Sequence, residues 1–224
     1  MRTKTLLLTA ALTAAGAATS LAQAVYSQNI VGYINVTNYP GYNLIANQLN
    51  NGATTPNKVV DLIPTPPEGT FVFKFSPATG GYTTIDFADG AWEGDDLNLQ
   101  ANPGEGIFVK NATANPFTVT FLGEVQLTSS VAIVSGYSIV SSVVPSAGPL
   151  SGAPPAGLNF PTAEGDFVYQ FNRATGGYIV NDFADGAWEG DGNGAPPQIA
   201  VGEAFFVKAG ASHAAWARTF TVGP

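Results

Sequence analysis

The sequence predicts an all-β protein of two tandem, internally duplicated modules, each a small barrel or sandwich of about five or six strands, rigidly joined. Three observations predict this fold. Apolar residues alternate along short segments, which is the period of a strand. Turn-forming residues are abundant, with 26 Gly and 16 Pro in 224 residues. A ten-residue segment, Asp86–Asp95, also recurs letter for letter as Asp182–Asp191.

The first residues have the pattern of a secretory signal peptide. Arg2 and Lys4 form a basic start, an apolar and alanine-rich stretch follows, and Ala22–Ala24 offers a small-x-small cleavage site. The apolar stretch is shorter than the ~20 residues of a membrane span. We therefore expect residues 1–24 to be removed. The mature chain is then exported to the periplasm, the cell surface or the medium, without membrane insertion.

The mature chain is strongly acidic. The formal charge of −8 becomes −10 once Arg2 and Lys4 are removed, because six basic residues then face sixteen acidic ones. Such a surface repels nucleic acid and anionic lipid, so we expect neither as a partner. The chain has no cysteine, which excludes disulfides and thiolate metal sites. Its stability must come from a core, for which 45% apolar residues suffice.

The repeat divides the mature chain into module 25–121 and module 122–224. The aligned pairs are Val31–Val36 with Leu122–Leu127, Gly41–Ala46 with Gly136–Ser141, Glu68–Phe75 with Glu164–Phe171, Ala78–Tyr82 with Ala174–Tyr178, and Gly104–Lys110 with Gly202–Lys208. Each copy is about 95 residues long, which is the size of a small domain.

The elements follow from alternation and turn residues. Phe71–Phe75, with its three phenylalanines on one face, should form a hairpin with Tyr82–Phe87 across a Pro/Gly turn. The alternating run Phe117–Leu127 predicts one strand that ends the first copy and begins the second. A helical turn is expected near Lys58–Ile63, and the Pro/Gly/Ala-rich segment Pro145–Pro161 predicts a surface loop.

The repeated decapeptide predicts a hairpin with an Asp-Gly turn, in which Asp86 faces Glu93 and Phe87 faces Trp92. Opposed carboxylates only ~5 Å apart repel each other, and a bound cation would relieve this. Oxygen ligands favour a hard ion such as calcium. The candidate metal ligands are Asp86, Asp89, Glu93 and Asp95, with Asp182, Asp185, Glu189 and Asp191 in the second copy. The alternative is a tight turn with an aromatic plug and solvated acids.

Aromatic residues near this segment are candidate ligand-binding groups. Tyr82, Trp92, Tyr178 and Trp188 could offer flat platforms for sugar rings beside hydroxyl-binding carboxylates. Alternatively, they fill a small β core, which is the more frequent use of such side chains.

No catalytic residue is assigned. His213 is the only histidine, it lies in an Ala/Gly/Ser-rich segment, and the first copy has no equivalent. Two carboxylates about 5 Å apart would suit a retaining glycosidase, but that chemistry needs a substrate cleft, which a tight hairpin does not provide.

Several segments resemble a known group of proteins. Ser27–Val36, Gly41–Leu49, Phe73–Tyr82 and Pro103–Val109 are similar to exported β-repeat proteins of environmental Gram-negative bacteria. The resemblance covers nearly all of the mature chain. It implies export and a duplicated β module, and it brings no known activity or site residues.

These observations favour an exported, non-enzymatic structural or interaction protein of the cell envelope, surface or extracellular matrix, with calcium as a candidate stabilising ion. The alternative is a carbohydrate-binding module, and a glycosidase-like enzyme comes third. The expected partners are a polysaccharide or further copies of the chain, joined through edge strands near Ile30–Val36 and Arg218–Val222.

Overall fold

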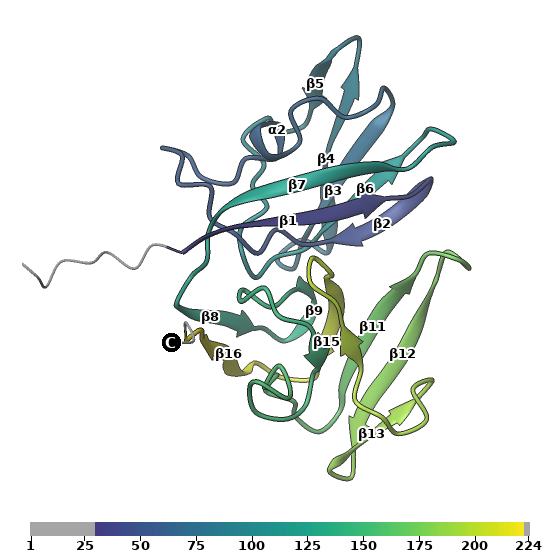
Figure 1. Cartoon of the computed structure of the whole chain (residues 1–224). Coiled ribbons are helices and arrows are strands. Elements are labelled where there is room, and N and C mark those ends of the chain that lie inside the picture. The colour runs from purple at the N-terminus through teal and green to yellow at the C-terminus, as the bar shows by residue number, and fades with distance from the viewer. Residues whose placement is uncertain (1–29, 222–224) are drawn as a thin grey trace, which may run out of the picture. The chain divides into compact units, whose positions relative to one another are not determined.

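The described part of the chain, residues 30–221 of a computed structural model, is built almost entirely from β-strands (Figure 1). It is 50% strand and 2% helical, with several antiparallel sheets, which confirms the all-β prediction. No sheet among these residues closes on itself, so the barrel alternative is not adopted. The expected signal peptide, residues 1–24, lies outside the described residues. Within them, no helix has the length and apolar character needed to span a membrane.

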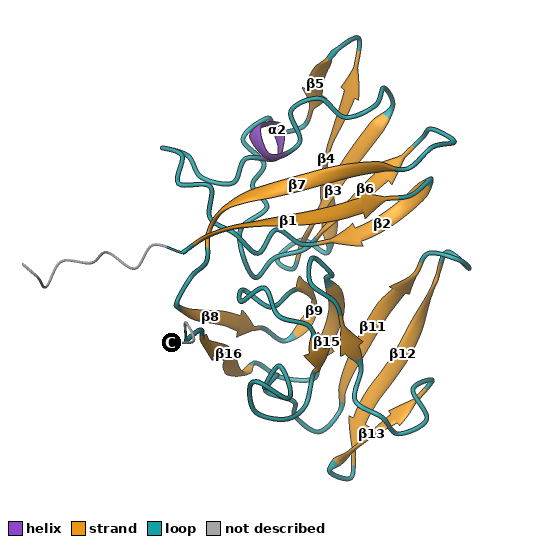
Figure 2. Ribbon diagram, in the orientation of Figure 1, coloured by secondary structure: helices purple, strands orange, loops and turns teal. Residues whose placement is uncertain are grey.

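A two-stranded ribbon and a five-stranded sheet make up the first half of the chain (Figure 2). The ribbon pairs β1 (Val31–Asn38) with β7 (Phe117–Glu124). The sheet has the order β2-β6-β3-β4-β5, with the bounds β2 Gly41–Ile45, β3 Thr70–Ser76, β4 Gly81–Ala88, β5 Ala91–Gly94 and β6 Ile107–Asn111. The expected helical turn is present as α2 (Val59–Leu62).

The second half repeats this strand order. Its sheet runs β9-β15-β11-β12-β13, with the bounds β9 Gly136–Val140, β11 Asp166–Asn172, β12 Gly177–Ala184, β13 Ala187–Gly190 and β15 Phe205–Ala209. Its ribbon pairs β8 (Thr128–Ile133) with β16 (His213–Thr219), and the short β10 (Gly148–Pro149) pairs with β14 (Gln198–Ile199). An origin of both halves by duplication stays a prediction.

The junction between the halves differs from the single strand predicted over Phe117–Leu127. The strand is interrupted after Glu124, because the chain changes partner there: β7 pairs with β1, whereas β8 pairs with β16. The counterpart of β1 is therefore β8, since each directly precedes the equivalent strands β2 and β9. The alignment of Val31–Val36 with Leu122–Leu127 was out of register.

In the segment Pro145–Pro161, only the middle, residues 152–156, forms a continuous exposed stretch as the predicted surface loop would. The rest of the segment contains β10, and Leu150, Leu158 and Phe160 belong to the buried core of the second half. The carbonyl of Leu158 also accepts a hydrogen bond of 2.8 Å from the indole of Trp216. Burial of these apolar side chains decides the path of a segment whose glycines and prolines suggested exposure.

Each sheet has one buried face and one aromatic face. Val72 and Val109 are fully buried in the first sheet, as is Phe121 in the ribbon. In the second half, Val168 of the sheet clusters with Trp216 of the ribbon. Because side chains alternate along a strand, the other face of each sheet receives the intervening residues, most of which are aromatic.

The two halves join through reciprocal hydrogen bonds within one compact unit that begins at Val31. The Ala46 amide donates to the Gly202 carbonyl at 2.9 Å, and the Ser141 amide donates to the Gly104 carbonyl at 3.0 Å. Ala46 and Ser141 are equivalent residues, as are Gly104 and Gly202. Each half thus offers the other the same pair of groups, as partners related by a two-fold axis do.

Candidate functional site: an aromatic cleft

The repeated decapeptide forms the predicted hairpin in both copies. Asp86 pairs with Glu93 and Phe87 with Trp92 in the first copy, and the second copy has the same register. Asp89 and Gly90 have φ values of 50° and 77°, and positive φ at both central residues defines a type I′ turn. The local sequence therefore specifies this hairpin.

One carboxylate of each copy of the decapeptide binds a backbone amide. The Asp95 carboxylate accepts a hydrogen bond of 2.9 Å from the Thr84 amide, and Asp191 accepts the equivalent bond of 2.8 Å from Val180. Asp89 and its counterpart Asp185 occupy the turn positions. Between residues 30 and 221, no three acidic or histidine side chains lie together so that they could hold a metal ion. Calcium binding remains a prediction.

The tryptophans pack against the protein. Trp92 meets Phe87 edge-on at 5.6 Å between ring centroids, and its indole donates to the Ile63 carbonyl at 2.9 Å. Trp188 makes the equivalent contact with Phe183 at 5.5 Å and is 4% exposed. The buried Trp188 therefore has no free face for a sugar ring, whereas Trp92 is only partly buried.

The aromatic face of each sheet carries Tyr82 or Tyr178. These two residues are 46% and 40% exposed. In the first sheet the face also carries Tyr42, Phe71, Phe73, Phe75 and Phe108, and in the second it carries Tyr137, Phe167, Tyr169, Phe171 and Phe206. The phenylalanines of β3 share one face, as predicted.

The two aromatic faces meet each other. The ring centroids of Phe108 and Phe171 are 5.4 Å apart, and those of Phe75 and Phe206 are 5.5 Å apart. These two contacts are equivalent, because Phe108 corresponds to Phe206 and Phe75 to Phe171. The backbones of the two halves also approach closely beside these contacts. Gly106 has no room for a side chain there, because a Cβ on it would lie 2.4 Å from the Ala204 Cβ.

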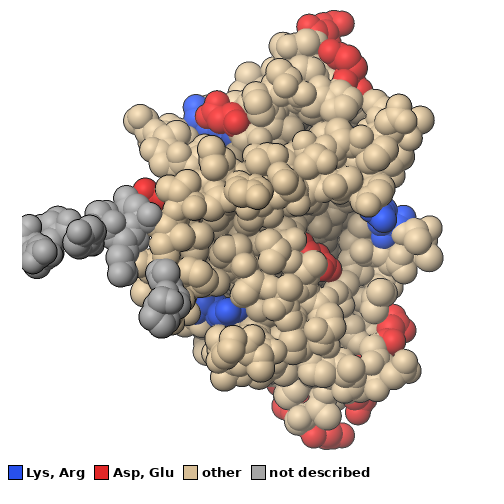
Figure 3. All heavy atoms as spheres, viewed as in Figure 1, with Lys and Arg blue, Asp and Glu red and all other residues tan. Residues whose placement is uncertain are grey.

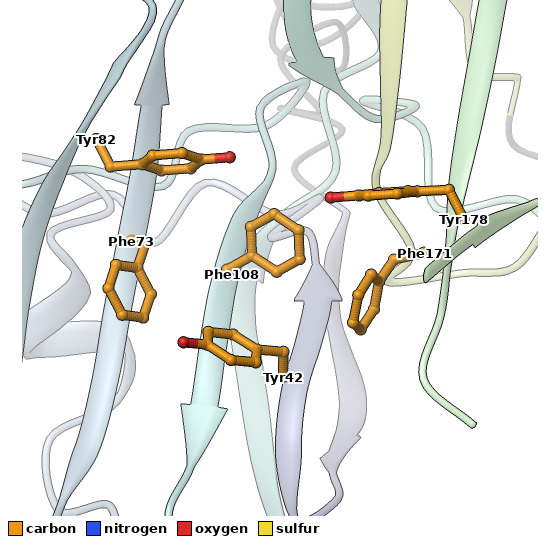
Figure 4. A pocket seen from close by; sticks show the side chains of 6 residues that line it. All are labelled: Tyr42, Phe73, Tyr82, Phe108, Phe171 and Tyr178. Atoms are coloured by element: carbon orange, nitrogen blue, oxygen red, sulfur yellow. The ribbon is translucent and has the colours of Figure 1, made fainter. Parts of the chain in front are cut away.

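Two cavities flank this contact. The first measures about 370 Å³ and is lined by Tyr42, Phe73, Tyr82, Phe108, Phe171 and Tyr178 (Figure 4). The second measures about 410 Å³ and is lined by Phe75, Gly80, Tyr137, Tyr169, Tyr178 and Phe206. Most lining residues of one cavity are the counterparts of those in the other. We call the two cavities together the aromatic cleft.

Three tyrosine hydroxyls of the cleft, those of Tyr82, Tyr169 and Tyr178, have raised pKa values and keep their protons at neutral pH. Burial raises the pKa of Tyr82, and burial together with the nearby Tyr82 raises the pKa of Tyr178. Figure 4 shows these two hydroxyls directed toward each other across Phe108. Burial and a hydrogen bond with Tyr137 raise the pKa of Tyr169 to about 12. A protonated hydroxyl can donate and accept hydrogen bonds, so the cleft offers both aromatic faces and polar groups.

The sequence pointed to Tyr82 and Tyr178 as candidate ligand-binding residues but not to the other residues of the cleft. The signal was present in the Gly-Tyr pairs at Tyr42 and Tyr137, which both copies retain, and in the Phe-rich alternation of β3. Only the packing of the two sheets brings these residues together.

His213 lies outside the cleft, at the start of β16 rather than in a loop. Its Nε2 is 2.9 Å from the buried carboxylate of Asp166. Thr70 occupies the position equivalent to Asp166, so this pair belongs to the second half alone.

Comparison of the chain with protein-family models, curated proteins and solved structures finds no match.

Proposed function

We propose that this chain is an exported, non-enzymatic binding protein whose aromatic cleft takes up a carbohydrate chain. The observation that carries the proposal is the first cavity, whose six lining side chains are all aromatic and come from both sheets. Its volume of about 370 Å³ lies within the range of small-molecule sites.

The chemistry of the cleft suits a saccharide. The C–H groups on one face of a pyranose ring are weakly positive and pack on the negative face of an aromatic ring. Tyr42, Tyr82 and Tyr178 line the same cavity, and tyrosine hydroxyls can exchange hydrogen bonds with sugar hydroxyls. The equivalent cavity shares Tyr178, so one chain of sugar units could contact both.

Binding to a panel of soluble polysaccharides by affinity electrophoresis and calorimetry tests this function. We expect Tyr42→Ala and Tyr137→Ala to weaken binding about tenfold, the loss that ~1.4 kcal/mol of contact energy represents. Tyr33→Ala is the matched control, because Tyr33 is 71% exposed on β1 and does not line the cleft. Equal losses in all three variants, or no binding by the wild-type protein, would contradict the proposal.

A second candidate is self-association as a structural protein. The outer face of the β1–β7 ribbon exposes Val31, Tyr33 and Leu122 by 65%, 71% and 61%, and Tyr33 lies opposite Leu122. An exposed apolar cluster of this kind favours a protein interface. Sedimentation of the wild-type protein and of Leu122→Gln tests it: a concentration-dependent oligomer that the substitution abolishes would support this role, and a monomer at all concentrations would exclude it.

A further inference from the structure

We propose that the carbohydrate is anionic, and that Lys110 and Lys208 each bind one of its carboxylate groups. This inference rests on the proposed function and narrows its ligand to polysaccharides with acidic sugar units. It follows from the placement of two equivalent lysines beside the cleft.

Each lysine is held between two aromatic rings. The Lys110 Nζ lies 5.7 Å from the ring centroid of Tyr42 and 5.2 Å from that of Phe71. The Lys208 Nζ lies 5.7 Å from Tyr137 and 5.5 Å from Phe167, the equivalent pair. Contacts between a cation and ring faces restrict an otherwise flexible side chain. Both ammonium groups are thereby positioned in the same way.

Neither ammonium has a carboxylate partner in the described part of the chain. The ion pairs found there are Lys74 with Glu105 and His213 with Asp166. Asp86 is on the same face as Lys110, but it lies two strands away across Phe71, at about 10 Å by the spacing of strands. In a chain of net charge −8, two uncompensated cations at equivalent sites therefore stand out.

The lysines border the cavities through the tyrosines that they contact. Tyr42 lines the first cavity and Tyr137 the second. A sugar ring held in either cavity would have its carboxylate close to one ammonium. A polymer with repeated carboxylates could use both lysines at once, and the two contacts would reinforce each other.

The distribution of charge on the protein argues against a ligand with a higher charge density, such as nucleic acid. Several acidic side chains gather at the two ends of the molecule where the β4–β5 and β12–β13 hairpins lie (Figure 3), and they repel an approaching polyanion. Nucleic acid carries one charge per ~1.7 Å and needs many cations along its path. Two separate lysines match an acidic polysaccharide, in which each sugar unit carries at most one carboxylate and the charge density is lower than that of nucleic acid.

Matched pairs of polysaccharides test the inference by calorimetry on the mature protein. Polygalacturonate is compared with its methyl ester, and alginate with its propylene glycol ester, because esterification removes the charge and keeps the sugar backbone. We expect the acidic form of at least one pair to bind tenfold or more tightly than its ester at low salt. This preference should decline as salt is added, because screening weakens the contact.

The double variant Lys110→Met/Lys208→Met should bind the acidic form only as tightly as the ester, because methionine keeps an apolar stem between the rings. Lys58→Met, at the start of α2, is the control and should retain the preference. Near-ultraviolet circular dichroism verifies that each variant is folded. Equal binding of acid and ester by the wild-type protein would overturn the inference and leave the proposed function intact. Binding of neither form would overturn both, and an unchanged preference in the double variant would overturn the role of the two lysines.

Discussion

The two copies of the decapeptide have the same ten residues and the same hairpin, yet their tryptophans meet different surroundings. Trp188 is 4% exposed and donates to the Ser151 hydroxyl at 2.7 Å. Trp92 is only partly buried and donates to the Ile63 carbonyl, just after α2. The hairpin is thus set by its own sequence, whereas the burial of its tryptophan is set by the segment that covers it.

A second pair of equivalent sites differs in charge. Lys74 binds Glu105 at 2.8 Å in the first half. In the second half, Gln170 replaces the lysine and donates to the equivalent Glu203 at 3.2 Å. Burial raises the pKa of Glu203, and the hydrogen bonds from Ala200 and Gln170 only partly oppose this effect. Equivalent positions therefore hold a carboxylate in an ion pair in the first half and a carboxylate with hydrogen bonds alone in the second.

Substitution of the two tryptophans should have the largest effect on stability. Trp188→Ala should lower the free energy of unfolding by about 3–5 kcal/mol, because it leaves a cavity in the core. Trp92→Ala should cost about half as much, since part of that side chain is already in water. Urea denaturation of both variants measures the difference. Equal losses would show that the covering segments contribute equally.

Gln170→Lys should make the second half resemble the first. A carboxyl whose pKa is raised on folding holds its proton more tightly in the folded state, so stability falls as pH rises through that pKa. The new ammonium should lower the pKa of Glu203 and stabilise the protein near pH 7 by about 1 kcal/mol. Urea denaturation between pH 4 and pH 7 measures this gain, which should vanish at the acidic end. The control is Lys74→Gln, which should lose stability at neutral pH.

The tyrosines of the cleft should make the stability of the protein depend on pH in the alkaline range. Tyr169 in the second half has Phe73 as its counterpart in the first. The pKa of Tyr169 is raised to about 12, so the folded protein retains a proton that the unfolded chain loses above about pH 10. Stability should therefore decline between these values, and Tyr169→Phe should reduce the decline. Denaturation at pH 9 to 11.5 measures it, and tyrosinate absorbance reports the titration. An identical decline in the variant would contradict the assignment.

The smallest expected effect is that of chelation. If calcium binds at the hairpin carboxylates, EDTA should lower the melting temperature, since a ligand of the folded state stabilises it by mass action. The shift should be small, because Asp95 and Asp191 already accept backbone hydrogen bonds. The double variant Asp86→Asn/Asp182→Asn is the control and should show no shift. An unchanged melting temperature of the wild-type protein in EDTA would contradict calcium binding.

The sequence by itself determined the local structure. The Asp-Gly turn, the pairing of Phe87 with Trp92 and the shared face of the β3 phenylalanines follow from turn chemistry and from the two-residue period of a strand. These features depend on neighbours in the chain. A single stretch of residues therefore contains all the information they need.

The tertiary structure alone decided the register of the halves and the assembly of the cleft. After Glu124 the chain changes its partner, because β7 pairs with β1 and β8 pairs with β16. The apolar alternation of the sequence fits one continuous strand equally well, so it does not predict this change. The contact between Phe108 and Phe171 joins residues far apart in the sequence and in different sheets. Alternation identifies two faces of a strand but not which face another sheet will cover, because that depends on the packing of the whole molecule.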